Sequence, residues 1–188
     1  MNNRILCFLV LLISSCSSVD ESAQTKNIFR YNESSGIHSF DPAFAKDQSR
    51  IWFCNQVYNS LVQLDDTLQV QASIAKRWSV SNNSLVYNFV LRDDVQFHKP
   101  LNRSLTIEDV VYSLNRLKSE ETASPGAWVL SSMQSLVALN DSTLQIRLKE
   151  PNPAFLGLLS MQYCSILPVE AETKAGFFEA PIGTGPFH

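Results

Sequence analysis

Side chains that could carry out covalent or metal chemistry are few in this sequence, and they are widely spaced. The 188 residues include four cysteines and three histidines. His38, His98 and His188 lack the spacing of metal ligands, and no Cys-x-x-Cys pair occurs. No serine or cysteine can be matched to a histidine as nucleophile and base. We therefore expect no metal, no cofactor and no catalytic residue, and we expect that the protein is not an enzyme.

Three other polar features have structural explanations. His98 follows Phe97 just past an expected strand, where we expect it to pack; a ligand role is the alternative. Glu108 and Asp109 fall in the first turn of an expected helix, where acids favour the helix dipole. The glycines of residues 183–185 lack the lysine and the helix that a phosphate-binding loop needs, so they indicate a crossover between subdomains.

Cys16 is the residue with the clearest predicted chemistry. Arg4 precedes an apolar run, Ile5 to Ile13, that ends in Ile-Ser-Ser-Cys. A run of this length spans about 14 Å as a helix, too short for a bilayer core of about 30 Å. It is therefore typical of a signal peptide, residues 1–15. The last four residues resemble a bacterial lipobox, which predicts lipid attachment at Cys16; an ordinary signal peptide with a chance cysteine is the alternative.

Composition limits which partners and which kind of fold are expected for the rest of the chain. Small polar residues after Cys16 indicate a flexible tether over residues 16–26. The formal net charge of −3 and the absence of a basic cluster exclude nucleic acid as an expected partner. With 45% hydrophobic residues the chain can build a core, and we expect a monomer. Outside the cytoplasm Cys54 and Cys164 could form a disulfide, or they could stay buried and unpaired.

The pattern of apolar residues predicts mixed secondary structure. Strands are expected at residues 27–31, 78–80, 85–91, 136–139, 144–148 and 165–167. Helices are expected around residues 51–61, from a cap at Thr106 to Leu117, and at residues 153–159. Hairpins predominate over regular βαβ alternation, so the fold class is a mixed α/β one with α+β character.

Seven segments together resemble one family in their order along the chain. They are Asp41-Pro42-Ala43, residues 57–62 (VYNSLV), 72–78 (ASIAKRW), 87–98 (YNFVLRDDVQFH), 105–114 (LTIEDVVYSL), 151–156 (PNPAFL) and 183–187 (GTGPF). The sequence is similar to the family 5 extracellular solute-binding proteins, the peptide- and nickel-binding components of ABC importers. Members are much longer, so the resemblance implies the N-terminal part of such a protein, either a fragment or a truncated gene product.

The resemblance implies a type II periplasmic-binding-protein-like clamp, whose two lobes close on a ligand. Residues 27–58 would begin lobe I, residues 59–180 would form the accessory subdomain, and residues 181–188 would return to lobe I. Two segments align with regions that reach the ligand. They are Lys46, Asp47 and Gln48, and then Ser124, Gly126 and Trp128 within residues 124–128.

Each of these residues has an alternative role. Lys46 could pair with a ligand carboxylate or be an ordinary surface lysine. Trp128 could form the floor of a pocket or pack in the core. The position aligned with Gly126 often has a large side chain in the family, so the pocket here must differ in shape.

The expected function is a lipid-anchored, periplasm-facing protein that captures peptides or similar small solutes for an ABC permease. Two other classes stay open: a structural or adhesive surface lipoprotein on the same scaffold, and a lipoprotein hydrolase whose catalytic residues would lie outside this sequence. A truncated product would not bind ligand normally.

Overall fold

The computed structural model describes residues 28, 30–33, 36–37 and 39–188, and the chain divides into two units, residues 1–32 and 33–188. The predicted signal peptide, Cys16, the tether and His38 lie outside the described residues. Ile28, Arg30 and Tyr31 belong to no strand, so the strand expected at residues 27–31 is wrong for these residues. Neither of the two sheets provides the neighbouring strand whose hydrogen bonds a strand needs. Everything below concerns the second unit.

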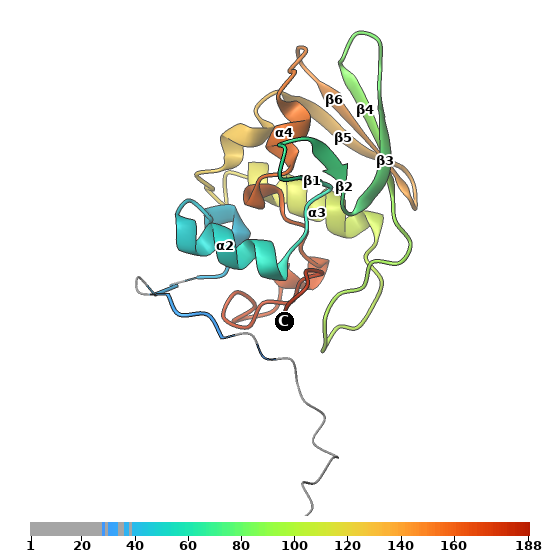
Figure 1. Ribbon diagram of the computed structural model, residues 1–188. Coiled ribbons are helices and arrows are strands. Elements are labelled where there is room, and N and C mark those ends of the chain that lie inside the picture. Colours follow the sequence, from blue (N-terminus) through green and yellow to red (C-terminus); the bar gives the residue numbers. More distant parts are fainter. Residues whose placement is uncertain (1–27, 29, 34–35, 38) are drawn as a thin grey trace, which may run out of the picture. The chain divides into compact units, whose positions relative to one another are not determined.

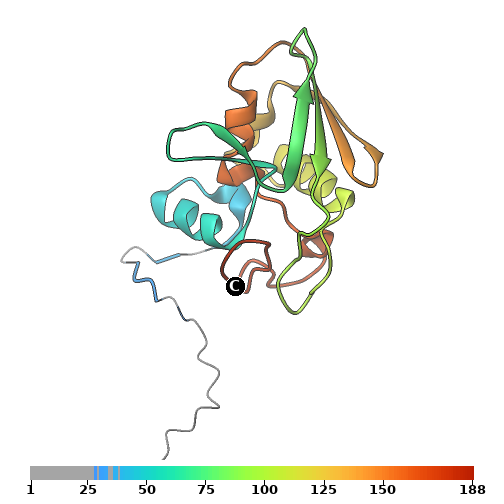
Figure 2. The ribbon, with the colours of Figure 1, turned by 45° about the vertical axis from the view of Figure 1, so that its right-hand side comes forward.

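An antiparallel sheet forms one side of this unit (Figures 1 and 2). Its four strands are β3 (Ala75–Val80), β4 (Val86–Leu91), β5 (Met133–Asn140) and β6 (Thr143–Leu148), in the order β3-β4-β6-β5. Tyr87, Phe89 and Leu91 are buried at alternate positions of β4, as expected for one covered face. The two predicted hairpins are confirmed, with β3 and β5 longer than expected.

A second, smaller sheet pairs β1 (Val62–Leu64) with β2 (Val70–Ala72). The turn between them is built on Asp65, whose Oδ1 accepts hydrogen bonds from the backbone N–H groups of Thr67 and Gln69. Asp65 thus builds the turn, and the two strands that flank it were not predicted.

The longest helix, α3 (Ile107–Lys118), begins where Thr106 and Asp109 predict it. Asp109 is fully buried and its Oδ2 accepts a hydrogen bond from the Thr106 backbone N–H at 2.8 Å. It also forms a bidentate ion pair with Arg103, which in turn binds Glu170. The hydrogen bonds that Arg103 donates to the Asp109 and Glu170 carboxylates raise the pKa of its guanidinium above the ordinary value. The structural explanation of Asp109 is confirmed.

The other helices are short. They are η1 (Pro42–Phe44), α2 (Gln48–Val57), η2 (Ala127–Leu130), α4 (Phe155–Leu159), η3 (Gln162–Cys164) and η4 (Val169–Glu172). The helix expected at residues 51–61 ends earlier, because Tyr58 is extended and caps α2. The strand expected at residues 165–167 is wrong: the segment is extended but joins neither sheet, and Ile166 donates one backbone hydrogen bond to Asn59.

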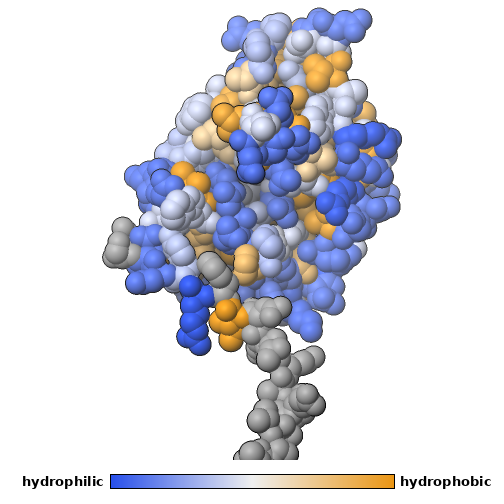
Figure 3. Space-filling view, in the orientation of Figure 1, coloured by the Kyte–Doolittle hydropathy of each residue, from blue (hydrophilic) through white to orange (hydrophobic). Residues whose placement is uncertain are grey.

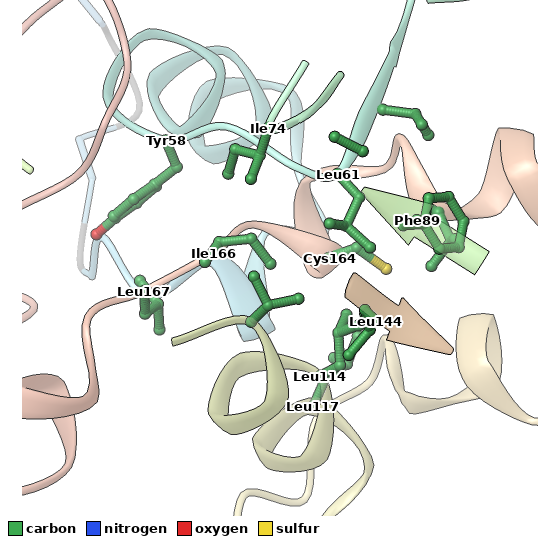
Figure 4. Close-up of a cluster of buried hydrophobic side chains, with 14 of the residues drawn as sticks. Tyr58, Leu61, Ile74, Phe89, Leu114, Leu117, Leu144, Cys164, Ile166 and Leu167 are labelled. Carbon is green, nitrogen blue, oxygen red and sulfur yellow. The ribbon is translucent and has the colours of Figure 1, made fainter. Parts of the chain in front are cut away.

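The core lies between the sheet, α3 and the segment after η3 (Figure 4). Phe89 and Leu144 come from the sheet, Leu114 from α3, and Ile166 from the later segment, and each is fully buried. The fold class predicted from the sequence, a mixed α/β arrangement with antiparallel hairpins, is confirmed. In the part of the chain that the structure describes, no helix has the length and apolar character to cross a bilayer.

Residues 183–187 lie against the end of α2. The backbone N–H of Gly185 donates a hydrogen bond to the Val57 carbonyl, and that of Phe187 donates to the Gln56 carbonyl. His98 Nε2 donates to the Gly185 carbonyl at 2.7 Å. A Cβ on Gly183 would lie 1.9 Å from the Val57 carbonyl oxygen, so the close approach requires glycine there. His98 therefore packs against this segment, as expected.

Candidate functional site

The second of the two segments predicted to reach a ligand is attached to η1, the short helix that precedes the first of them. The region around this attachment, the corner, consists of η1, the loop Lys46–Gln48, α2, residues 124–130 and η3. The helices η1, α2 and η3 contact one another. The Ser124 hydroxyl donates a hydrogen bond to the Ala43 carbonyl, so the second predicted segment is attached to η1, the short helix just before Lys46. The structure therefore brings together residues that are far apart in the sequence.

Two aspartates fix the backbone on either side of Lys46, because each caps a neighbouring helix. Asp41 accepts a hydrogen bond from the Ala43 backbone and starts η1. Asp47 caps α2 by accepting from the Arg50 backbone N–H at 3.1 Å, and its carboxylate also binds the Arg50 side chain. These hydrogen bonds lower the pKa of Asp47. All three loop residues are exposed, so Lys46 and Gln48 can meet a solute while Asp47 is occupied by the cap.

An ion pair attaches the corner to α3. Arg116 donates to Asp41 Oδ1 at 3.0 Å and to Oδ2 at 2.6 Å, and its guanidinium also lies over the Phe178 ring. Burial alone would lower the pKa of Arg116, but the hydrogen bonds and charge of Asp41 raise it above its ordinary value. The pair is mostly shielded from water, with 17% of the Arg116 side chain and 7% of Asp41 exposed. It therefore holds η1 in one position relative to α3.

Gly126 lies directly over an aromatic ring. A Cβ built on Gly126 would be 2.3 Å from Cγ and Cδ1 of Tyr163, well inside contact distance. The ring of Tyr163 thus occupies the space that a side chain at position 126 would take. Ser124 helps to hold Gly126 close to the ring, because its hydroxyl oxygen accepts a hydrogen bond from the Gly126 backbone N–H at 2.9 Å.

Trp128 is not a core residue. It lies on η2 and 55% of its surface is exposed, whereas its neighbours Val129 and Leu130 are fully buried. The structure therefore rules out core packing, which was the alternative for this tryptophan. Ser124 shows the opposite behaviour: it is buried and its hydroxyl is used within the protein.

Sequence reasoning missed the contribution of η3. Gln162 donates a hydrogen bond to Asn55 of α2, and Tyr163 lies beside Gly126. These residues carry no motif, and a single sequence does not show that a small residue at 126 is matched by a ring at 163. A set of related sequences in which the two positions vary together could have revealed the pair.

Two polar hollows lie in this unit, and the smaller is lined in part by Asn55 and Gln162 of the corner. The larger, of about 260 Å³, is bounded by Asn59, Gln63, Arg92, Gln96 and Thr184 among others. The smaller, of about 70 Å³, shares Asn59 and Gln63 and reaches Gln162. Arg92 is engaged by Asp94, so the larger hollow has little unpaired charge. Their lining suits water and neutral hydrogen-bonding groups.

Neither cysteine of this unit has the properties of a nucleophile. Cys54 and Cys164 are buried and unpaired, which confirms the second alternative for them. Burial raises the pKa of each thiol to about 12, so both stay protonated at neutral pH. Among the described residues, no three His, Cys, Asp or Glu side chains gather as a metal site would require.

On the face shown in Figure 3 hydrophobic side chains form small separate patches on a largely hydrophilic surface. Trp128 is exposed in the corner, and Tyr163 is half-buried there. The exposed groups of the corner include the Trp128 ring and the Lys46 ammonium group.

The sequence of this unit matches a known family of proteins. Residues 69–188 match the family model described as bacterial extracellular solute-binding proteins, family 5 Middle. The chain belongs to this family.

Its relatives in sequence include proteins of more than one kind. The chain is 36% identical over 155 residues to the dipeptide-binding protein of Escherichia coli strain K12. This match covers 70% of this chain and 29% of that protein. It is 31% identical over 172 residues to the HTH-type transcriptional regulator SgrR of Salmonella typhi, covering 87% of this chain and 28% of the regulator.

Solved structures agree with the fold. NikZ from Campylobacter jejuni, in complex with Ni(L-His), is 31% identical with a TM-score of 0.70, covering 80% of this chain and 30% of NikZ. The periplasmic binding protein DppA from Helicobacter pylori, in complex with the peptide STSA, is 30% identical with a TM-score of 0.70. The match covers 79% of this chain and 33% of DppA. The chain thus spans about a third of the length of these structures, and the predicted resemblance to part of a type II binding-protein clamp is confirmed.

Proposed function

We propose that this chain is part of a solute-binding protein that captures peptides or similar small solutes and delivers them to an ABC permease. The observation that carries the proposal is the corner, within a chain that belongs to family 5. The Ser124 to Ala43 hydrogen bond attaches one segment that is expected to reach the ligand to η1, which precedes the other. The protein would bind its solute without changing it covalently.

Each part of the chain has a proposed place in the clamp. Residues 27–58 would begin lobe I, residues 59–180 would form the accessory subdomain, and residues 181–188 would return to lobe I. The backbone hydrogen bonds from Gly185 to the Val57 carbonyl and from Phe187 to the Gln56 carbonyl support this division, because the chain would leave lobe I and return to it at the same place. The hydrogen bonds from Asn59 Nδ2 to the carbonyl and hydroxyl oxygens of Thr184 support it as well.

A lipid on Cys16 would hold the protein at a membrane, facing the periplasm, with residues 16–26 as the tether. The periplasmic location has support from relatives such as DppA, which is described as a periplasmic binding protein. Labelling cells with an alkyne-modified palmitate should mark the wild-type protein and leave Cys16→Ser unmarked. Equal labelling of both proteins would reject this anchor.

Solute binding is tested by ligand-dependent stabilisation of the protein as encoded in its gene, including any sequence beyond His188. A peptide at a hundred times its dissociation constant should stabilise the fold by about 2.7 kcal/mol. The probes are mixtures of dipeptides and tripeptides, with a nickel–histidine complex and a neutral sugar as comparisons. If none of these probes raises the melting temperature, the proposed function is wrong.

A regulatory role has one observation in its favour, the similarity to a transcriptional regulator over 87% of this chain. A structural or adhesive surface lipoprotein stays a further alternative. Gene context separates them: neighbouring genes for a permease and an ATPase favour transport, and their absence favours one of the alternatives.

A further inference from the structure

The larger of the two polar hollows is built by four stretches of the chain that are far apart in the sequence. Asn59 lies just after α2, Gln63 is on β1 and Ser73 directly follows β2, while Gln96 belongs to the loop after β4 and Thr184 to residues 183–187. The volume of the hollow is about 260 Å³, close to the lower end of the range for small-molecule sites, about 300 Å³. It therefore has room for one small molecule.

Hydrogen bonds between these stretches hold the walls of the hollow in place. The Arg92 backbone N–H donates to the Ile74 carbonyl at 2.9 Å, and the Ile74 N–H donates to the Ser60 carbonyl at 3.2 Å. The loop after β4 is closed where Gln96 pairs with Ser104 through a backbone bridge and a side-chain hydrogen bond of 2.8 Å. Walls that are already fixed lose less conformational entropy when a ligand binds.

Several polar groups of the lining keep unused hydrogen-bonding capacity. The Nδ2 group of Asn59 is used within the protein, but its Oδ1 accepts no hydrogen bond from the residues that the structure describes. Gln96 likewise uses Nε2 and not Oε1, and the side chains of Gln63 and Ser73 make no hydrogen bond within the described part of the chain. None of these atoms is enclosed, because the buried side-chain atom without a partner among the described residues is His98 Nδ1. These groups are therefore open to a ligand.

The lining also indicates the chemical class of that ligand. Arg92 donates to both carboxylate oxygens of Asp94, at 2.8 and 2.7 Å, so the two charges offset each other and favour a neutral molecule. The described residues around the hollow include no aromatic ring that could stack on a flat ligand. Amide and hydroxyl side chains offer donors and acceptors side by side, and so do the hydroxyl groups of a polyol. Ile74 and Val95 provide a small apolar surface for its C–H groups.

We propose that this hollow is a second ligand site, which binds a neutral polyol of about the size of one sugar unit through Asn59, Gln63, Ser73 and Gln96. The site is distinct from the corner, because neither Lys46 nor any other residue of the loop Lys46–Gln48 is among the described residues that line it. The proposal goes beyond peptide capture and does not depend on it.

The experiment measures sorbitol and glucose binding by isothermal titration of the protein as encoded in its gene. Both should bind with dissociation constants in the millimolar range, as expected for ligands of about twelve non-hydrogen atoms. Gluconate, which differs from sorbitol by its carboxylate, should bind more weakly, because Arg92 is already paired with Asp94. Tighter binding of gluconate than of sorbitol would show that the hollow takes anions, and would overturn the proposed ligand class.

Two glutamines of the β1–β2 hairpin provide a matched pair of variants. Both are exposed, but Gln63 lines the hollow and Gln69 does not. Gln63→Leu should weaken sorbitol binding by roughly two- to twelvefold, the range for one hydrogen bond between neutral groups, and Ser73→Ala should have an effect of the same size. Gln69→Leu should leave sorbitol binding unchanged. Melting temperatures of the three variants show whether each is folded.

The outcomes separate this proposal from peptide capture. If neither sorbitol nor glucose binds, the hollow holds only water and the proposal is wrong. Binding that Gln63→Leu and Ser73→Ala leave unchanged would place the polyol elsewhere and overturn it as well. Loss of polyol binding in Gln63→Leu with peptide binding retained supports a separate site, whereas loss of both would make the hollow part of the peptide site. If no peptide binds while sorbitol binding depends on Gln63, the proposed function fails and the polyol site stands.

Discussion

The sheet with α3 and the corner are built by different means. The sheet region is regular: neighbouring strands pair through backbone hydrogen bonds, and residues such as Phe89 and Leu144 cover one face. The corner is a set of short turns connected by side chains, including the Asp41–Arg116 pair and the Ser124 hydroxyl. Apolar packing therefore stabilises the first region, whereas specific polar contacts position the second. A binding site gains adaptable shape from such turns, while the sheet provides the stability.

Truncating the core of the sheet should have the largest effect. Phe89 is fully buried, so Phe89→Ala should destabilise the fold by about 3–5 kcal/mol, the range for loss of a buried aromatic side chain. Trp128→Ala in the corner should change stability by less than about 0.5 kcal/mol, because the residue is largely exposed. Urea unfolding followed by circular dichroism measures both. Equal losses would show that the corner is as much a part of the core as the sheet.

The difference between the regions also explains what the sequence could predict. Alternating apolar residues in β4 and the acid after Thr106 are local signals, so the hairpins and α3 were predicted. The corner depends on contacts between distant residues: Asp41 and Arg116 are 75 positions apart, Ser124 and Ala43 are 81, and Gln162 and Asn55 are 107. No local pattern encodes such contacts. The resemblance indicated Lys46 and Trp128, but the place of Tyr163 emerged only from the fold.

Breaking the connection between the two regions should have the next largest effect. Asp41→Asn keeps the shape of the side chain but leaves the partly buried Arg116 without a charged partner. The expected loss is about 2–3 kcal/mol, below the usual 3–5 kcal/mol for a fully buried pair, since Arg116 retains some contact with water. Chemical unfolding measures the loss.

Asp47→Asn provides the matched control for Asp41→Asn. Its partner Arg50 is on the same helix and the Asp47 side chain is 46% exposed, so the change should cost less than about 1 kcal/mol. A loss for Asp41→Asn as small as that for Asp47→Asn would contradict the role of the ion pair as the attachment between corner and α3.

Cysteine reactivity tests how tightly the corner is packed. Cys54 lies on α2 and Cys164 on η3, and burial raises the pKa of both to about 12. At pH 8 the native protein should leave both thiols unmodified by iodoacetamide over minutes, whereas the urea-unfolded protein should react at both within that time. Mass spectrometry of the peptides that contain each cysteine gives the extent of reaction. Rapid modification of Cys164 in the native state would show that η3 opens easily.

The β1–β2 hairpin belongs to neither region and should show the smallest effect. Four hydrogen bonds to the Asp65 carboxylate, led by that of the Thr67 hydroxyl, hold its pKa at about 2, below the ordinary 3.8. Because the folded-state pKa is the lower one, this contribution to stability is complete above the ordinary pKa and is lost as the pH falls toward 2. The Asp65→Asn variant should therefore differ most from the wild type at neutral pH and least near pH 2, as measured by melting temperature. Asp66→Asn, at the exposed next position, should follow the wild type at every pH. A constant difference between Asp65→Asn and the wild type from pH 7 to pH 2 would show that the Asp65 carboxylate does not stabilise the turn in this pH-dependent way.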